Sequence, residues 1–382
     1  MKIAVVYQFM FPQNFGGGEK RLFEVFSRFP DSATVDWYPQ YTENYEDYSE
    51  LKGFNIFPLE DMTRPSDERS IKETLKFCFL LIFKLNFSKY DFIHVGQMPF
   101  FHVFALLMKK VFLKALFRKT PHIVIDWWEY WGSYWDSKHG KITALVGRFV
   151  EKCIYLFGDE FVVISYKTNN DVQPHTKANL TLIHNGVDLN KIDQAPSLHK
   201  NIDVIIFGRV EEWKNPQMGV YVFEEMLKVK PGLSMLIVGN GSYKATLEQY
   251  VVNHNLSGSI KFFGFAKDDD EIYGLIKSSK LMMQFSKQEG GGSITLFEAN
   301  GCGVPVVTSY FENGIDKELV TSDNGFFFEE QNHKNIAMAL VDFLDNTEEQ
   351  EKMKISAREF VAQYDWSIIS KEYYELFSKL MS

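Results

Sequence analysis

Residues 204–212 (VIIFGRVEE), 235–242 (MLIVGNGS) and 289–309 (EGGGSITLFEANGCGVPVVTS) decide the fold of this chain. Each stretch contains a short hydrophobic run rich in β-branched residues, with glycine or a polar loop at its end. A helical pattern follows each of the first two runs directly. A third helical pattern, SITLFEANGC, lies between the glycine turn after Glu289 and the run PVVTS. This alternation predicts a parallel β-sheet with helices packed on its faces.

The same alternation extends over the whole chain and predicts two α/β domains. In the first half we expect strands at 2–7, 91–96, 122–131, 160–165 and 180–188, with helices from Glu19 and at 71–89, 99–118 and 141–157. Residues 41–70 are rich in turn formers and should be irregular. In the second half, strands are expected at 204–207, 234–238, 260–263, 281–285, 305–308 and 325–328, and helices at 216–229, 242–254, 269–278, 293–302, 332–346 and 349–363. A last amphipathic helix should cover 366–380.

Composition narrows the class of protein. The 382 residues are 45% hydrophobic, enough for two domains with separate cores. The three cysteines show neither metal-ligand nor disulfide spacing, which favours a reducing compartment. The N-terminal MKIAVVYQFMF enters a strand without a signal pattern, and no apolar run approaches the ~20 residues of a membrane helix. We expect a cytoplasmic protein.

Charged side chains follow the predicted strands of the second half at four places. Arg209 and Lys214 come after the strand at 204–207, and Glu289 and Glu298 flank the glycine turn. Ligands of such sheets bind at the carboxyl ends of the strands. Two cations and two carboxylates around a glycine turn are the groups needed to hold a sugar attached to a diphosphate.

Five pieces in this order resemble a known family. In chain order they are the interdomain HNGVD, FGRVEEWKN, IVGNG, FFGF and EGGGSITLFEANGCGVPVV, and they are similar to segments of the retaining glycosyltransferases of family 4. The resemblance implies the GT-B fold, an α/β architecture of two Rossmann-like domains with parallel sheets facing across a cleft. It implies an acceptor-side domain at 1–185, a nucleotide-sugar-binding domain at 186–363, and a helix at 364–382 that crosses back to the first domain.

The resemblance also implies roles for residues. Arg209 and Lys214 match the cations that contact the donor diphosphate, Glu289 the acid beside the transferred sugar, and Glu298 the acid on the ribose. The family has seven residues between its two acids, whereas this chain has eight, so we expect the extra residue in the glycine turn. Ser293 should cap the following helix. The remaining donor-binding candidates are glycines and helix-start residues: Gly16, Gly17, Gly18, Gly208, Gly239, Gly290, Gly291, Gly292, Ser293, Ile294 and Thr295.

The acceptor candidates lie in the first half. Many relatives carry a histidine where this chain has Trp128, and Asp126 and Glu129 flank that position. An aromatic ring there could stack on a sugar or belong to the core. His94, at another strand end, is a further candidate. Arg21 follows the glycine loop at 16–18, and its side chain either faces the cleft or lies on the surface of the helix.

A basic segment points to a second kind of partner. Residues 72–119 contain nine Lys or Arg and two acidic residues among many Phe and Leu, although the whole chain has a net charge of −9. Such a segment suits an anionic membrane interface, and it also fits an ordinary amphipathic helix pair. Nucleic-acid binding is not expected, because the overall charge is acidic and no recognition motif follows.

The predicted activity is metal-independent transfer of a hexose from a nucleotide-diphospho-sugar to a glycan or lipid-linked acceptor, with retention and without a cofactor. No histidine pair has metal-ligand spacing and no DxD motif follows a first-domain strand. The glycine loop lacks the G-x-G-x-x-G pattern of a dinucleotide site. Two alternatives stay open: a nucleotide-sugar epimerase of the same fold, and a degenerate transferase kept as a scaffold subunit. Oligomeric state is undetermined.

Overall fold

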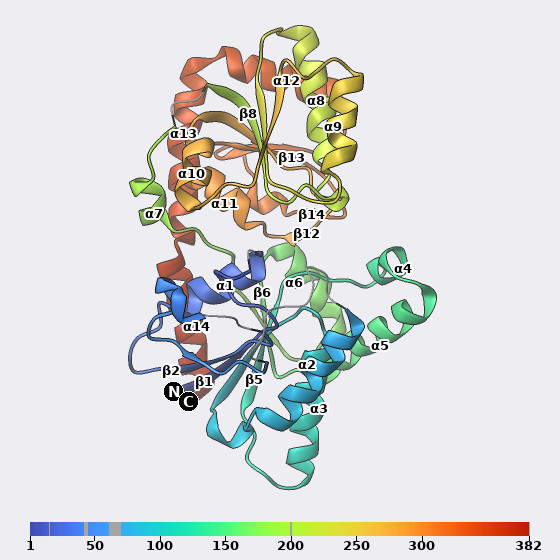
Figure 1. The fold of residues 1–382 in the computed structure, drawn as a ribbon, viewed down its shortest axis with the longest axis vertical. Helices are drawn as coiled ribbons and strands as arrows, with labels where there is room; N and C mark the ends of the chain where they lie inside the picture. The colour runs from blue at the N-terminus through green and yellow to red at the C-terminus, as the bar shows by residue number, and fades with distance from the viewer. Residues whose placement is uncertain (15, 42–44, 61–69, 199–200, 382) are drawn as a thin grey trace. The chain divides into compact units, whose positions relative to one another are not determined.

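A computed structural model describes residues 1–14, 16–41, 45–60, 70–198 and 201–381. The chain forms two compact units (Figure 1). Unit 1 comprises Met1–His184 and Ile369–Ser382, and unit 2 comprises Asn185–Ile368. Within the described ranges, no helix combines the length and the apolar character needed to cross a bilayer.

Unit 1 is built on a parallel seven-stranded sheet with the order β3-β2-β1-β4-β5-β6-β7. The chain starts in the middle, moves to one edge, and returns to extend the sheet from β1 through β4, so the direction of winding changes between β1 and β4. Its strands are β1 (Lys2–Val6), β2 (Thr34–Tyr38), β3 (Asn55–Ile56), β4 (Phe92–Gly96), β5 (His122–Trp127), β6 (Glu160–Val163) and β7 (Asn179–Leu182).

Helices cover both faces of this sheet. One face carries α2 (Ile71–Lys84), α3 (Phe101–Ala115) and α5 (Lys141–Phe157), whose inward side chains join the sheet in a single core. On the other face, α1 (Gly17–Phe26) packs against α14 (Trp366–Met381), where Ser370 Oγ donates to the Val25 carbonyl at 2.7 Å. The shorter helices are α4 (Tyr134–Lys138), α6 (Tyr166–Val172), η1 (Tyr45–Asp47), η2 (Ser49–Leu51), η3 (Phe87–Lys89) and η4 (Gln173–His175).

Unit 2 repeats this plan with six parallel strands in the order β10-β9-β8-β11-β13-β15, and its winding changes direction between β8 and β11. The strands are β8 (Ile202–Phe207), β9 (Met235–Val238), β10 (Ile260–Gly264), β11 (Ser279–Met283), β13 (Val306–Ser309) and β15 (Gly325–Phe328), beside a separate pair, β12 (Gln288–Gly291) and β14 (Asn313–Ile315). The helices are α7 (Leu189–Gln194), α8 (Pro216–Val229), α9 (Lys244–Asn253), α10 (Asp269–Lys277), α11 (Ile294–Gly301), α12 (His333–Asp345), α13 (Thr347–Val361), η5 (Glu212–Lys214), η6 (Lys317–Leu319) and η7 (Ala362–Tyr364).

The predicted α/β class with two parallel-sheet domains is confirmed. Strand β2 and helix α6 were missed. β2 is exposed at its start and buried only over its last three residues, so it lacks the long apolar run of an inner strand. The predicted strand at 122–131 ends at Trp127, because the chain then turns into a loop. In the region expected to be irregular, 42–44 and 61–69 lie outside the described residues, and the rest holds η1, η2 and β3.

Candidate active site

A pocket opens where the winding of unit 2 changes direction. It is lined by the residues that follow β8, among them Gly208, Arg209 and Lys214, and by Gln284 and Ser286, which follow β11. In doubly wound sheets this crevice is where ligands bind, because two neighbouring loops leave the strand ends in opposite directions. The predicted cations Arg209 and Lys214 therefore lie at the expected edge of the sheet.

Arg209 and Lys214 have different surroundings. Arg209 is exposed, and its guanidinium lies 5.0 Å from the ring centroid of Trp213. Lys214 is partly buried, lies 4.8 Å from the same ring, and forms an ion pair with Glu289. Trp213 thus contacts both cations, as a ring with a negative face can. The sequence reasoning did not select it, although its place between the two cations was a signal.

The Lys214–Glu289 pair continues into a polar network. Glu289 also accepts a hydrogen bond of 3.4 Å from the Gln284 amide, and that amide donates to Ser293 Oγ at 2.7 Å. Thr295 Oγ1 lies 2.8 Å from Ser293 Oγ and donates to Gln284 Oε1 at 3.2 Å. Gln284 is the centre of this network and was not predicted. Its signal was a lone polar side chain at the end of an otherwise apolar strand.

The glycine turn before α11 adopts backbone conformations that favour glycine. Gly290 and Gly291 have φ of 57° and 87°. The ladder between β12 and β14 shifts its register here, since Gln288 pairs with Asn313 but Gly291 with Ile315. One extra residue of β12 is thus accommodated in a bulge of the glycine turn. Ser293 occupies the N-cap position of α11, but its side chain makes no capping bond and instead joins the network of Gln284.

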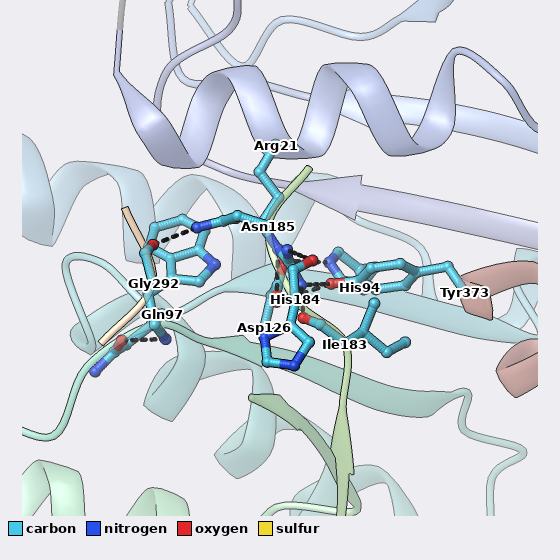
Figure 2. Close-up of polar contacts among 10 residues, drawn as sticks. Arg21, His94, Gln97, Asp126, Ile183, His184, Asn185, Gly292 and Tyr373 are labelled. Atoms are coloured by element: carbon cyan, nitrogen blue, oxygen red, sulfur yellow. Dashed lines mark hydrogen bonds and ion pairs between the residues drawn. The ribbon is translucent and has the colours of Figure 1, made fainter. Parts of the chain in front are cut away.

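Two further donor candidates, Gly208 and Gly239, approach each other closely. A Cβ atom added to Gly239 would lie 1.9 Å from the Gly208 carbonyl oxygen, and both residues have positive φ. Only glycine fits this contact. Glu298 is buried in α11, 3.5 Å from the hydroxyl of Tyr273. Asn185, at the start of unit 2, donates to the Gly292 carbonyl at 2.6 Å and so holds the end of the glycine turn (Figure 2).

In unit 1, the glycine loop lies against Trp128. Gly16 is the N-cap of α1, and Gly17 and Gly18 form its first turn. A Cβ atom on Gly18 would come within 2.4 Å of the Trp128 ring, and one on Gly96 within 2.8 Å. The half-buried indole therefore fills the space that two glycines leave. Glu129 is also half-buried, and its carboxylate accepts a hydrogen bond of 3.0 Å from the Trp131 indole.

Gln97 positions this aromatic loop and was missed by the sequence reasoning. It is completely buried directly after β4. Its Oε1 accepts from the backbone N–H of Trp128 at 2.8 Å and of Glu129 at 3.0 Å, and its amide donates to the Glu129 carbonyl. One side chain thereby replaces the strand partners that the chain loses after Trp127.

The predictions for Asp126 and His94 need correction. Both side chains are fully buried, so neither can contact an acceptor in this structure. Asp126 accepts from Arg21 Nε at 3.0 Å and from the Tyr373 hydroxyl at 2.9 Å, and His94 Nε2 lies 3.5 Å from the same carboxylate (Figure 2). Burial disfavours the charged carboxylate, but the Arg21 charge and hydrogen bonds outweigh burial and lower the pKa of Asp126 to about 2.

Arg21 is the centre of this buried cluster, and it lies neither at an open surface nor on an exposed helix face. Besides Asp126, its guanidinium donates to the carbonyls of Ile183 at 2.8 Å and His184 at 2.7 Å and to the Tyr373 hydroxyl at 2.7 Å. It therefore joins α1, β5, the segment after β7 and α14. This cation is fully used by internal partners, and its role is structural.

Comparison with known proteins relates unit 2 to a family of glycosyl transferases. Residues 189–360, which span most of unit 2 and include its pocket, match the family model of glycosyl transferases group 1. This part of the chain is similar to that family. The uncharacterized glycosyltransferase MJ1069 of Methanocaldococcus jannaschii is 22% identical over 287 residues, 72% of each chain. A GDP-mannose-dependent monoacylated alpha-(1-6)-phosphatidylinositol monomannoside mannosyltransferase of Corynebacterium glutamicum is 28% identical over 154 residues, which are 38% of this chain and 39% of that enzyme.

Solved structures of other glycosyltransferases share the fold of this one. Anabaena Alr3699/HepE, crystallised with UDP, aligns with a TM-score of 0.72 at 19% identity and covers 99% of this chain and 100% of that one. Sucrose-phosphate synthase from Thermosynechococcus elongatus aligns with a TM-score of 0.79 at 18% identity, covering 100% and 99% of the two chains. The glycosyltransferase has two Rossmann-like units of the GT-B type.

Proposed function

We propose that this glycosyltransferase is a family 4 enzyme that transfers a hexose, with retention, from a nucleotide-diphospho-sugar to a glycan or lipid-linked acceptor. The donor is bound mainly by unit 2 and the acceptor mainly by unit 1. The observation that carries the proposal is the pocket of unit 2, which joins an exposed arginine and a lysine at the carboxyl ends of β8 and β11. The Lys214–Glu289 ion pair connects this pocket to the glycine turn.

The chemistry of the leaving group explains why these residues are suitable. When the anomeric C–O bond breaks, negative charge grows on the diphosphate oxygen. Preorganised cations stabilise that charge, and such electrostatic effects are usually the largest contribution to catalysis. Arg209 can grip two phosphate oxygens with its planar fork, and Lys214 can act as a point charge beside it. Trp213 keeps both cations near the pocket without neutralising them.

The carboxylates have separate roles. Glu289 is oriented by Lys214 and Gln284, so its free lone pairs can accept hydrogen bonds from sugar hydroxyls. Lys214 has three N–H donors and can therefore contact Glu289 and a phosphate oxygen together. The family resemblance assigns Glu298 to the ribose hydroxyls, although its side chain is buried in α11 in this structure. We assign no nucleophile: a phosphate oxygen of the donor accepts the proton of the acceptor hydroxyl as the new bond forms on the same face.

The nature of the substrates is suggested by the relatives. Alr3699/HepE was crystallised with UDP and with UDP-glucose, which supports a nucleotide-sugar donor. Among the curated relatives are a phosphatidyl-myo-inositol mannosyltransferase of Mycolicibacterium smegmatis and the O-antigen biosynthesis glycosyltransferase WclY of Escherichia coli, which supports a lipid-linked or glycan acceptor. We propose that no metal ion or other cofactor takes part, since Arg209 and Lys214 supply the positive charge. Turnover should then be unchanged by EDTA.

Calorimetric titration with a panel of nucleoside diphosphates tests the donor assignment. We expect one nucleoside diphosphate to bind to the native protein and to bind much more weakly to Arg209→Ala and Lys214→Ala, whereas Arg358→Ala, which removes a cation of α13, should bind like the native protein. Proton NMR of the product should show the anomeric configuration of the donor. A changed sugar without acceptor would indicate an epimerase, and no affinity for any nucleoside diphosphate would favour the scaffold alternative.

A further inference from the structure

Three neighbouring helices of unit 1 leave a broad apolar surface uncovered. Helices α2, α3 and α5 lie side by side on one face of the sheet (Figure 1). Their outward positions carry large exposed hydrophobic side chains, among them Phe83 at 71%, Phe112 at 64%, Ile142 at 82% and Phe149 at 61%. The other exposed hydrophobics of these helices are Ile71, Leu75, Phe79, Ile82, Val111, Leu145, Val146, Leu156 and Phe157, and Phe117 follows α3. We call this set the three-helix face.

A groove runs along this face between α2 and α3. Leu75, Ile82, Phe104, Met108 and Phe112 line it, and its walls are almost entirely apolar. Exposed hydrophobic residues are common when they are scattered singly, but a contiguous set of this size marks an interaction surface. The sequence had pointed to 72–119; the structure adds α5, which comes later in the chain and lies beside α3.

The charges of the three-helix face have one sign. Together α2, α3 and α5 contain nine Lys or Arg and two acidic residues. Neither acid opposes an anionic surface: Glu151 is buried and accepts from the Trp135 indole at 2.9 Å, and Glu73 caps the start of α2 through Ser70. The face is therefore basic and apolar in a chain whose net charge is −9.

Not all of these cations are available to a partner. Lys109 donates to the carbonyls of Ile82 at 2.7 Å and Leu85 at 2.6 Å, and buried Lys110 is paired with Asp159. These two lysines hold the helices together. In contrast, Lys72, Lys114, Lys141 and Lys152 are exposed and form no ion pair within the described part of the chain. These four available lysines are distributed over α2, α3 and α5, whereas the basic residues noted in the sequence all lie within 72–119.

We propose that the three-helix face docks on an anionic lipid bilayer. Aromatic and aliphatic side chains would enter the interface, while the surrounding lysines would lie at the level of the negatively charged headgroups. A second copy of this chain suits the face poorly, because a two-fold interface would bring the same lysines against each other. The proposal does not depend on the assigned sugar chemistry, since it uses no residue of the pocket.

Co-sedimentation of the full chain with vesicles tests the proposal. Vesicles of phosphatidylcholine with one third phosphatidylglycerol should pellet the native protein, and pure phosphatidylcholine should pellet at least about tenfold less. Lys72→Glu/Lys114→Glu/Lys141→Glu/Lys152→Glu should lose at least about tenfold of the binding to anionic vesicles. Phe83→Ser/Phe112→Ser/Phe149→Ser should lose a similar amount, because the apolar contact is removed.

Matched controls lie on unit 2. Phe265→Ser removes an exposed aromatic side chain and Lys334→Glu/Lys352→Glu reverses exposed charges, and both should pellet like the native protein. Nucleoside diphosphate binding and circular dichroism, measured on every variant, show that each is folded. Equal pelleting with both kinds of vesicle would overturn the anionic assignment. Failure to pellet with the anionic vesicles would overturn the proposal. This holds whether the protein is then found as a monomer, as a dimer through the three-helix face, or bound to a protein partner.

Discussion

Two arginines show how differently the two units use the same residue type. Arg21 and Arg209 both come after the first strand of their sheet, near the place where the winding changes direction. Arg21 is 1% exposed and donates to a carboxylate, a hydroxyl and two carbonyls, whereas Arg209 is exposed beside a tryptophan ring. A buried cation needs partners for its hydrogen bonds, and those partners leave nothing for a ligand. The accessible arginine is the one suited to binding.

The largest expected effect is a loss of stability on removing Arg21. In Arg21→Ala, Asp126 would keep its buried charge without the cation, so the free energy of unfolding should fall by about 3–5 kcal/mol. Urea titration followed by circular dichroism measures this loss. Arg21→Lys should lose less, since it retains the charge but not the planar fork. A loss in Arg21→Ala as small as that of an ordinary surface substitution would show that the comparison is mistaken.

Removing Arg209 should reduce turnover strongly and leave stability almost unchanged, the reverse of what is expected for Arg21. We expect Arg209→Ala to reduce turnover by roughly 10²–10³-fold, the usual effect of losing one group that stabilises transition-state charge. Its free energy of unfolding should stay within about 0.5 kcal/mol of the native value, because the side chain is exposed. Steady-state kinetics and urea titration on the same preparation measure both quantities. Turnover reduced less than threefold would remove the catalytic role assigned to Arg209.

Acid should weaken the buried cluster over a defined pH range. The pKa of Asp126 is lowered from 3.8 to about 2, so its stabilising contribution is complete above pH 3.8 and is lost as the pH falls through 2. This contribution is on the order of 2 kcal/mol. The difference in unfolding free energy between the native protein and Asp126→Asn should therefore shrink by this amount between pH 5 and pH 2. Asp31→Asn, at an exposed position, serves as the control. A constant difference would contradict the ion pair.

The smallest effect is expected at Trp213. Each cation–π contact contributes about 0.5–1 kcal/mol, so Trp213→Leu should weaken nucleoside diphosphate binding two- to fivefold by freeing both cations to move. Calorimetry measures this change. In Arg209→Ala the same substitution should have a smaller effect, because one of the two cations is already gone. Equal effects in the two backgrounds would show that Trp213 does not act through Arg209.

Most elements of unit 2 could be predicted from the sequence because its strands contain short apolar runs that end at a glycine or a polar residue. The helices α8 and α13 and the strand β15 appear within two residues of their predicted bounds. The pocket follows from the same rule, since the carboxyl ends of parallel strands lie on one edge. Unit 1 was harder. Asp126 lies near the end of β5 and His94 in the middle of β4. Burial decides their role, and burial depends on which elements pack against them.

What the sequence determined by itself was the period of its hydrophobic runs and the identity of the groups at their ends, because these depend on neighbours a few residues apart. It therefore predicted parallel sheets with helices on their faces in both domains and a cationic turn in the second. Only the tertiary structure decided which charged side chains are paired with partners inside the protein. The partners of Arg21 come from positions 105 to 352 residues away, and the lysines of α2, α3 and α5 share a surface only after folding. Such pairings are set by chain topology, which short-range patterns do not encode.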